Sequence, residues 1–371
     1  MKVLFAGAGS LFGLEEIKKK CASINLIADF VENSFMSKQL SDDDKHFIRI
    51  ADSSNFDDYD IVLPVNEYWL SKCIEGNISN ISLNAQKASR DKVFFSECLK
   101  KNHIPHCKQI DIDKLDQITG NIIIKPRYAY SGKGVSLFTS KCTQSLEDCI
   151  KFAQSGINKT KSITNVTDNE VTFWQYEEGD EYSADVFVEH GTVYIIRICE
   201  KVIRIVNNRP CNLGYRLINP VPQLLSALSS WCNVLYTSNN VSFAQFDFIK
   251  RYSDNEYIPI DYASRVAGGV RVLLQQLKEN PYSNALIHKL YSITEGITQI
   301  NLVSKKSGCI VSDDYYIENL SCFKYKKQGD FISDDITSGS NHLAEFICST
   351  LSRDDFEKVA LLGLQGDKYV S

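Results

Sequence analysis

The sequence predicts a chain of mixed class, in which an α/β domain with a parallel sheet precedes an α+β region with antiparallel sheets. In residues 1–85, short apolar strands alternate with helical stretches, which is typical of βαβ units. In residues 171–198, strands that alternate polar and apolar side chains are separated by short turns, which is typical of antiparallel sheets. The 371 residues exceed the size at which a single core stops growing, so two or three subdomains are expected.

The N-terminal stretch is predicted to contain four strands and an early helix. The strands are expected at residues 3–6, 24–28, 47–50 and 60–65, and the helix at 11–21. The turn Gly7-Ala8-Gly9-Ser10 after the first strand raises the alternative of a nicotinamide-binding fingerprint, with Asp29 as the acid that binds the ribose. Because Phe12 occupies the position of the third glycine, the spacing favours a tight strand-to-helix turn.

Two lysines follow in a pattern that favours phosphate binding. Residues 86–106 are predicted to form one helix, which carries Lys92. An apolar strand then ends in Lys125, and the small residues of 131–134 lead back into another strand. Backbone N–H groups in such a loop can approach a phosphate closely, and a lysine at the strand end adds positive charge. Arg127 stands where a Walker A loop needs its first glycine, so that motif is excluded. A plain hairpin with a surface lysine stays an alternative.

Two aspartates are predicted to face each other across a hairpin that turns at Asp254. On this register Asp247 lies opposite Asp261, and the Cβ atoms of such cross-strand neighbours are about 4.5–5.5 Å apart. Two carboxylates this close repel each other unless a cation lies between them, so the register indicates Mg²⁺. Arg265 shares the face of Asp261 and can hold a phosphate oxygen. The alternative is an exposed hairpin whose polar face happens to carry two aspartates.

Composition excludes several classes of partner. The formal net charge of −5 gives no long-range attraction to nucleic acid or to an anionic membrane. There is no apolar run of about 18 residues, so no transmembrane helix is expected. The twelve cysteines contain no C-x-x-C pair and the six histidines are dispersed, so neither a zinc site nor a disulfide scaffold is expected. These features predict a cytoplasmic protein with reduced thiols.

Taken in order, these features resemble the ATP-grasp superfamily over residues 1–275. Within it they are most similar to carbamoyl-phosphate-synthetase-like ligases and to the amino-acid ligase of pyrrolysine biosynthesis. The order of five segments carries the resemblance, rather than any single motif. These segments are Leu63-Pro64-Val65-Asn66-Glu67, Asp91-Lys92, the Lys125 strand with its glycine loop, Gly179-Asp180-Glu181-Tyr182-Ser183, and the Asp247/Asp261 hairpin ending in Arg265-Val266-Ala267-Gly268-Gly269.

The resemblance implies an ATP-grasp fold in four parts. A Rossmann-like parallel-sheet domain is expected at 1–85, and a helical segment with the lid subdomain at 86–180. The antiparallel-sheet catalytic subdomain is expected at 181–300, and strands and a helix that complete the core at 301–371.

The resemblance also implies roles for single residues, with ATP and Mg²⁺ bound. The implied ATP-binding residues are Lys92, Lys125, Ser131, Gly132, Gly134, Gln175, Glu177 and Glu181; the implied metal ligands are Asp247 and Asp261; and Arg265 and Lys125 are implied to be catalytic. Within this set the 131–134 loop would cover the phosphates, Gln175 and Glu177 would offer backbone hydrogen bonds to adenine, and Glu181 would bind the ribose.

The chain departs from the family at the metal site. Both carboxylates are aspartates, where the family usually has glutamate at one or both positions. Ala263 and Ser264 replace the Asn and Pro of the closing Asn-Pro-Arg motif, whose Asn is a common ligand of a second metal ion. The sequence therefore leaves the number of magnesium ions open, at one or two. On the hairpin register Gln245 faces Ala263, where it can supply the missing amide oxygen.

The resemblance implies an enzyme that uses ATP to join a carboxylate to an amine through an acyl phosphate. Both substrates would be small molecules, and the one that carries the carboxylate would be an amino acid. The candidate substrate site consists of Arg204 and Arg209, in a stretch that also carries Lys201 and Arg216, and of Gly268 and Gly269. A solvated loop is the equal alternative for that stretch. Two other functions stay open: a nucleotide-binding regulatory protein without catalysis, which the loss at Ala263 favours, and an NAD-dependent oxidoreductase, which rests on the glycine turn.

Residues 301–371 lie outside the resemblance. Strands are expected at 315–317 and 322–325, a loop at 333–340 and a helix at 342–351. Two roles stay open for this segment: it completes the substrate pocket, or it forms the contact of a homodimer.

Overall fold

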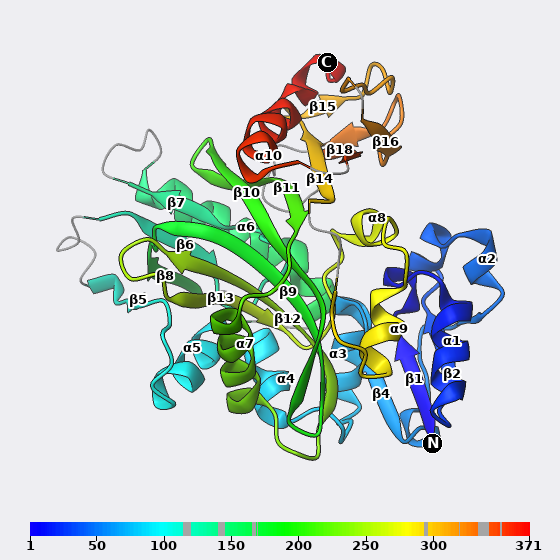
Figure 1. The fold of residues 1–371 in the computed structure, drawn as a ribbon. Coiled ribbons are helices and arrows are strands. Elements are labelled where there is room, and N and C mark those ends of the chain that lie inside the picture. The colour runs from blue at the N-terminus through cyan, green and yellow to red at the C-terminus, as the bar shows by residue number, and fades with distance from the viewer. Residues whose placement is uncertain are drawn as a thin grey trace.

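The computed structural model describes residues 1–113, 120–139, 145–164, 168, 170–292, 296–318, 320–332, 341–348 and 351–371. Within these residues the strands form a parallel sheet near the N-terminus, an antiparallel sheet in the lid region, a long central antiparallel sheet and a two-stranded ribbon (Figure 1). The central sheet lies between the N-terminal sheet and the lid sheet, and its last strands lie near the C-terminus (Figure 1). The predicted mixed class, with a parallel sheet followed by antiparallel sheets, is confirmed.

The N-terminal sheet is parallel, with strand order β3-β2-β1-β4. Its elements are β1 (Lys2–Ala6), η1 (Ala8–Ser10), α1 (Leu14–Ser23), β2 (Ile27–Glu32), η2 (Met36–Gln39), α2 (Asp42–Lys45), β3 (Ile48–Ile50), η3 (Phe56–Asp58), β4 (Ile61–Pro64) and α3 (Glu67–Glu75). The second strand begins three residues later than predicted. The reason is a turn after α1, in which Asn25 has a φ of 61° and Leu26 N–H donates to the carbonyl of Cys21 at 2.9 Å.

The predicted helix at 86–106 is wrong, because two helices replace it: α4 (Leu83–Arg90) and α5 (Lys92–Lys101). Asp91 separates them in an extended conformation and caps α5, since its carboxylate accepts the N–H groups of Val93 at 3.0 Å and Phe94 at 3.1 Å. Arg127 donates to the same carboxylate at 2.7 and 2.8 Å. The break places Lys92 at the first turn of α5, which faces the lid.

The lid sheet is antiparallel, with strand order β5-β8-β6-β7, and is covered by one long helix. Its elements are β5 (Gln109–Ile110), β6 (Ile122–Pro126), β7 (Ser136–Phe138), α6 (Leu146–Thr164) and β8 (Val171–Gln175). The predicted hairpin that follows Lys125 is confirmed, because β6 and β7 pair at Ile122–Phe138, Ile123–Leu137 and Ile124–Ser136.

The central sheet has the strand order β13-β12-β9-β10-β11-β14-β18-β16, and each neighbouring pair is antiparallel. Its strands are β9 (Gly179–Glu189), β10 (Thr192–Val206), β11 (Arg209–Leu217), β12 (Val241–Arg251), β13 (Tyr257–Ala263), β14 (Thr298–Val303), β16 (Ser321–Lys324) and β18 (His342–Cys348). The remaining elements are α7 (Pro222–Leu235), α8 (Arg271–Leu274), α9 (Pro281–Leu286), β15 (Gly308–Cys309), β17 (Phe331–Ile332), α10 (Arg353–Ala360) and η5 (Leu361–Tyr369).

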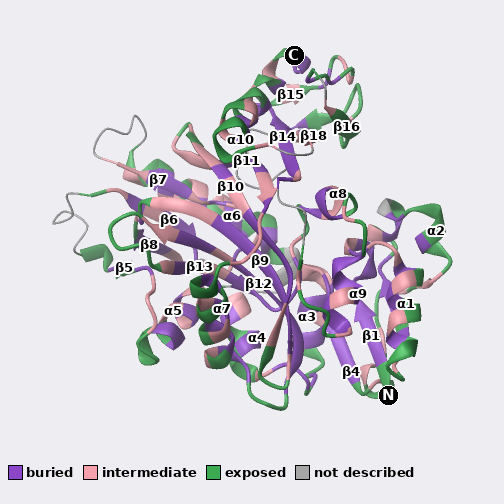
Figure 2. Ribbon diagram, in the orientation of Figure 1, coloured by how far each residue is buried: buried purple, intermediate pink, exposed green. Residues whose placement is uncertain are grey.

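One face of the β12–β13 end of this sheet is packed under helices. The ring centroid of Trp231 in α7 lies 5.4 Å from that of Phe246 and 5.3 Å from that of Phe248. Phe95 of α5 stacks on Tyr262, with ring centroids 5.4 Å apart. Figure 2 shows the strands of this region buried and the outer faces of the helices exposed. The polar face of β12 and β13 is therefore the opposite one, as the alternation in the sequence predicts.

The C-terminal segment continues the central sheet through β14, β18 and β16. The predicted helix at 342–351 is wrong, because β18 occupies His342–Cys348 and pairs with both β14 and β16. Burial on both faces explains the error, since the four consecutive residues 343–346 are all buried and the strand shows no alternation of buried and exposed positions. Residues 315–317 are irregular rather than a strand, β16 confirms the strand expected at 322–325, and the expected loop at 333–340 lies outside the described residues.

Eight of the cysteines in the described residues are buried, and Cys142 lies outside that part of the chain. They fill the cores as small side chains. Among the described helices, none has both the length and the apolar character needed to cross a membrane.

Candidate active site

A cavity of about 930 Å³ lies between the lid sheet and the polar face of the central sheet. The predicted site residues that line it are Lys92, Lys125, Ser131, Gly132, Gln175, Glu177, Glu181, Arg204, Asp247, Asp261, Arg265, Gly268 and Gly269. The fold thus brings together predicted site residues that are far apart in the sequence, from Lys92 to Gly269. Two predicted residues, Gly134 and Arg209, lie outside the described lining.

Gly134 belongs to the turn but packs on helix α6. It has a φ of 77°, and a Cβ at this position would lie 2.9 Å from the carbonyl oxygen of Ala153. Arg209 lies over the ring of Phe152, with its guanidinium carbon 3.8 Å from the centroid. Both residues therefore contact α6, and Ser131 and Gly132 form the part of the loop that faces the cavity.

Lys125 joins the lid sheet to the central sheet. Its side chain is buried, its Nζ donates to the carbonyl of Ile260 at 3.0 Å, and it lies 4.8 Å from the ring centroid of Trp174. Burial lowers the pKa of Lys125, while the nearby charge of Asp261 opposes that shift. The alternative of a surface lysine on a plain hairpin is therefore wrong.

Asp247 and Asp261 lie directly opposite each other on β12 and β13, as predicted. Gln245 pairs with Ala263 on the same register and also lines the cavity. A β-bulge between Asp247 and Phe248 shifts the pairing by one residue, so Phe248 lies opposite Pro259. The extra residue is Ile260, which turns toward the cavity instead of joining the buried face. Strict alternation from Asp261 would place Ile260 on that buried face, and the bulge accounts for the difference.

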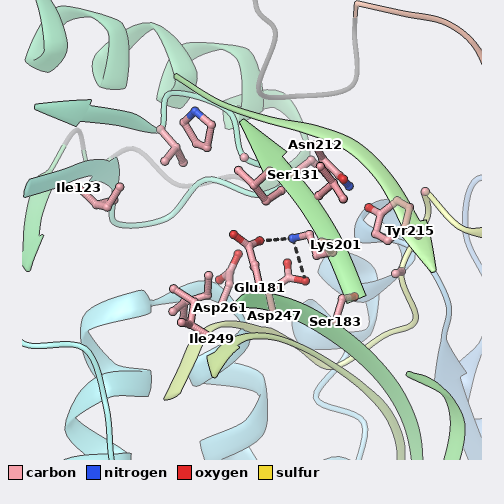
Figure 3. Close-up of a pocket in the computed structure, with 18 of the residues that line it drawn as sticks. Ile123, Ser131, Glu181, Ser183, Lys201, Asn212, Tyr215, Asp247, Ile249 and Asp261 are labelled. Atoms are coloured by element: carbon pink, nitrogen blue, oxygen red, sulfur yellow. Dashed lines mark hydrogen bonds and ion pairs between the residues drawn. The ribbon is translucent and has the colours of Figure 1, made fainter. Parts of the chain in front are cut away.

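Lys201 of β10 is a cation that pairs with Asp247 and with a third carboxylate, Glu181. Its ammonium pairs with Glu181 and lies 3.5 Å from Asp247 (Figure 3). Burial alone would lower the pKa of Lys201, but the charges of Asp247 and Glu181 outweigh burial and raise it. Lys92 lies 3.8 Å from Asp261 on the other side and also donates to the carbonyl of Ala129. These five groups form one cluster of two cations and three carboxylates.

Arg265 is held by an ion pair that connects the central sheet to the N-terminal domain. Its Nε lies 2.6 Å from the carboxylate of Glu67, which Arg90 also contacts at 2.7 Å. Burial would raise the pKa of Glu67, but Arg265 and Arg90 outweigh burial and lower it. Glu67 is the last residue of the Leu-Pro-Val-Asn-Glu segment, which is one of the five segments that carry the resemblance. Its contact with Arg265 gives this segment a structural role at the cavity.

A second buried pair supports the Gly268–Gly269 loop. Arg197 and Asp185 are both fully buried and contact each other at 2.8 Å, and Asp185 also accepts the N–H of Ala267 at 3.1 Å. This pair was not predicted from the sequence. A signal was available, because each residue lies between apolar neighbours within a strand, where a single charge requires a partner.

The glycine turn of the N-terminal domain does not line the cavity described above. Gly9 N–H donates at 2.9 Å to Glu32, a carboxylate that is 0% exposed and that also accepts from Trp69 at 3.0 Å and Asn66 at 3.1 Å. Asp29 is exposed in the middle of β2 rather than at its end. Since Glu32 takes the N–H that a pyrophosphate would need, this arrangement does not favour the nicotinamide alternative.

No protein-family model matches the sequence, and no curated protein matches it significantly. Solved structures do match. An L-amino acid ligase from Bacillus licheniformis is similar with a TM-score of 0.65 and 12% identity, over 100% of this chain and 98% of that one. A carboxyaminoimidazole ribonucleotide synthase from Aspergillus clavatus, complexed with ATP, is similar with a TM-score of 0.62 and 13% identity, over 100% and 99%.

A third similar structure is the biotin carboxylase domain of the 2-oxoglutarate carboxylase from Hydrogenobacter thermophilus, in complex with MgADP and bicarbonate. It matches with a TM-score of 0.55 and 13% identity, over 94% of this chain and 86% of that one. These likenesses extend over nearly the whole chain, including the C-terminal segment that lies outside the motif order. Together with the sheet order they show that this chain has the ATP-grasp fold.

Proposed function

We propose that the chain is an ATP-dependent ligase that joins a carboxylate to an amine through an acyl phosphate. One observation carries the proposal: a single cavity holds Lys92 and Lys125 from one side and Asp247 and Asp261 from the other. The fold adds support, because a similar structure is titled as an L-amino acid ligase and others hold ATP or MgADP. The proposed substrates are small molecules, with an amino acid as the acid.

Each side of the cavity has a proposed task. Lys92 and Lys125 bind the phosphates of ATP, and the N–H groups around Ser131 and Gly132 cover them. Gln175 and Glu177, which are two residues apart in the chain and both line the cavity, bind adenine through their backbone. Glu181 binds the ribose once Lys201, its partner in the structure, shifts toward Asp247.

The donor set fits one Mg²⁺ ion that binds together with the nucleotide. Asp247 and Asp261 offer the oxygen ligands that Mg²⁺ prefers. Among the described residues no group of three His, Cys, Asp or Glu side chains lies at metal-ligand spacing, so the two aspartates would hold the ion without a third side chain of these types. Gln245, opposite Ala263, is the proposed amide ligand. When bound, the ion neutralises charge on the phosphates.

The chain's own residues orient and neutralise the reactants. The substrate carboxylate attacks the γ-phosphorus, so an O–P bond forms and the bond to the ADP oxygen breaks. The amine then attacks the acyl carbon, a C–N bond forms, phosphate leaves, and the amine loses a proton. Arg265, held by Glu67, and Lys125 stabilise the charge on the transferred group. No protein nucleophile takes part, and the lid excludes water that would hydrolyse the acyl phosphate.

A second function has one observation in its favour. Lys201 pairs with Glu181 and Asp247, and Ala263 provides no metal ligand, so the carboxylates are neutralised without a metal. A nucleotide-binding protein without catalysis would need no more than this.

A coupled ADP-release screen over pairs of amino acids and amines, with mass spectrometry of the products, separates the two. The ligase produces ADP and an amide in equal amounts with at least one pair. Nucleotide binding without ADP release for any pair supports the non-catalytic protein.

We further propose a cytoplasmic location, because twelve cysteines without close pairs suit a reducing compartment.

A further inference from the structure

The C-terminal end of the cavity contains a buried carboxylate that the proposed chemistry does not use. Glu345 of β18 lines the cavity and is 2% exposed. It lies opposite Asn301 of β14 and Phe323 of β16, at the end of the central sheet that the motif order does not reach (Figure 1). A charged side chain in the middle of an otherwise apolar strand requires compensation.

Two acceptor oxygens at this place lack a donor. Within the described residues, Glu345 Oε2 and Gln299 Oε1 are buried and have no hydrogen-bond partner. The two side chains interact with each other, and the hydroxyl of Tyr325 hydrogen bonds to Glu345. Unsatisfied buried acceptors are rare in proteins, and two on neighbouring side chains indicate a ligand that brings several N–H or O–H donors.

The charge of the pocket selects among such ligands. The positive charge nearby is that of Arg271, which opposes the rise in the pKa of Tyr325. Its guanidinium lies 3.7 Å from Asp44 and donates to the carbonyl of Gly9 at 3.0 Å. Lys326 and His342 also line this end, yet within the described residues neither forms an ion pair with Glu345. A primary ammonium brings three donors and one positive charge, which matches two acceptors and one buried carboxylate.

The same cluster is connected to the predicted substrate loop. Gln299 Nε2 donates to the carbonyl of Gly269 at 3.0 Å and to Asn301 Oδ1 at 2.9 Å. Tyr215, which lies opposite Gln299 on β11, has its hydroxyl next to Gly269 and also lines the cavity. A ligand at Glu345 would therefore lie beside the loop that leads to Arg265.

We propose that Glu345, with Gln299 and Tyr325, binds the primary ammonium group of a substrate at the C-terminal end of the cavity. This inference rests on the proposed function and names the chemistry of one substrate. The ammonium can belong to the amine or to an amino acid that supplies the carboxylate. Burial raises the pKa of Glu345 to about 7, against the hydrogen bonds of Tyr325 and Gln299, and a bound ammonium would keep the carboxylate ionised.

The test measures the melting temperature of the full chain without nucleotide, at about pH 8, where Glu345 is ionised. The probes are the L-amino acids, their N-acetyl derivatives, and ethanolamine as an amine that has no carboxylate. At least one free amine is expected to raise the melting temperature by about 2–5 °C. Its N-acetyl derivative, which has lost the positive charge, is expected to have no effect.

Glu345→Gln keeps the size of the side chain and is expected to abolish the shift. Glu357→Gln is the matched control, because Glu357 lines the same cavity but is half-exposed and lies 3.4 Å from Arg204. The control is expected to retain the shift. A shift with ethanolamine assigns the ammonium to the amine substrate, and a shift with amino acids alone assigns it to the acid.

The proposal is overturned if no amine shifts the wild-type chain, if N-acetyl derivatives act equally well, or if Glu345→Gln responds as the wild type does. A crystal structure with a stabilising amine that shows only water at Glu345 overturns it as well. Since this readout needs no turnover, it is independent of the ligase proposal. Amine binding without ADP release in the screen would support the site and contradict the ligase.

Discussion

The ammonium of Lys201 lies 3.5 Å from the carboxylate of Asp247 and pairs with Glu181 in the same cluster. These residues come from three neighbouring strands, β10, β9 and β12. The lysine therefore occupies the place where a cation between carboxylates is required, and it sets the electrostatic state of the cavity in the absence of a nucleotide.

Replacing Lys201 by methionine leaves two partly buried carboxylates without a cation. We expect the free energy of unfolding to fall by about 2–4 kcal/mol, measured by urea denaturation, because a broken buried ion pair leaves its partner uncompensated. Added Mg²⁺ should restore part of the loss by binding the freed carboxylates. Lys19→Met is the control, since its pair with Glu15 is exposed on α1, and it should cost about 0.5 kcal/mol or less. Equal effects of the two substitutions would contradict the proposed role of Lys201.

Gln245 is the proposed third oxygen ligand beside Asp247 and Asp261. Gln245→Ala should raise the Mg²⁺ concentration needed for half-maximal ADP release by about 10-fold, as the loss of a supporting metal contact usually does. Gln276→Ala, whose side chain caps a carbonyl within the α8 region, is the control. An unchanged Mg²⁺ titration for Gln245→Ala would remove this residue from the metal site.

Lys125 should contribute to ATP binding through its buried charge. Lys125→Met is expected to weaken ATP binding by about 10–100-fold in calorimetric titration, which is the usual effect of losing a hydrogen bond to a charged group. Lys108→Met removes an exposed lysine from the strand region next to β8 and should leave the affinity unchanged. A wild-type affinity in Lys125→Met would show that the phosphates lie elsewhere.

The buried carboxyl of Glu345 predicts a specific pH dependence of stability. Its pKa in the folded chain is raised to about 7, above its ordinary value, so the folded state holds a proton that the unfolded state has lost. Stability is therefore lost as pH rises from the ordinary range of a glutamate to about 7, by up to about 3 kcal/mol. Glu345→Gln should be more stable than the wild type at about pH 8 and similar to it at about pH 4, by denaturant unfolding. A constant difference between the two chains across this range would contradict the assignment.

The order of motifs predicted the fold and most of the cavity, because each motif combines a local pattern with a fixed place in the chain. Asp247 and Asp261 were placed opposite each other by counting from Asp254. Near the turn, the observed register differs by one residue from a hairpin centred on Asp254. The bulge at Ile260 shifts the register back by one residue, so the two aspartates pair as predicted. Periodicity alone does not reveal a bulge, so the agreement depended on a feature that the pattern did not contain.

The remaining misses have different causes. The position of Lys201 depends on the register of β9 and β10, and β18 was mistaken for a helix because burial on both faces erased its alternation. Asp91 was read as the interior of a helix, although an aspartate before an apolar pair is also a good N-cap. Glu345 was overlooked because the missing partner of its Oε2 is visible only once the neighbouring strands are placed.

Transfer of oxygen from the acid to phosphate tests the central claim most directly. A carboxylate found in the ADP-release screen is labelled with oxygen-18 in both positions and turned over with ATP and the amine, and the released phosphate is analysed by mass spectrometry. Activation as an acyl phosphate predicts that each phosphate carries one labelled oxygen, because the carboxylate oxygen that attacked the γ-phosphorus leaves with it. Phosphate without label, formed together with the amide, would contradict the account.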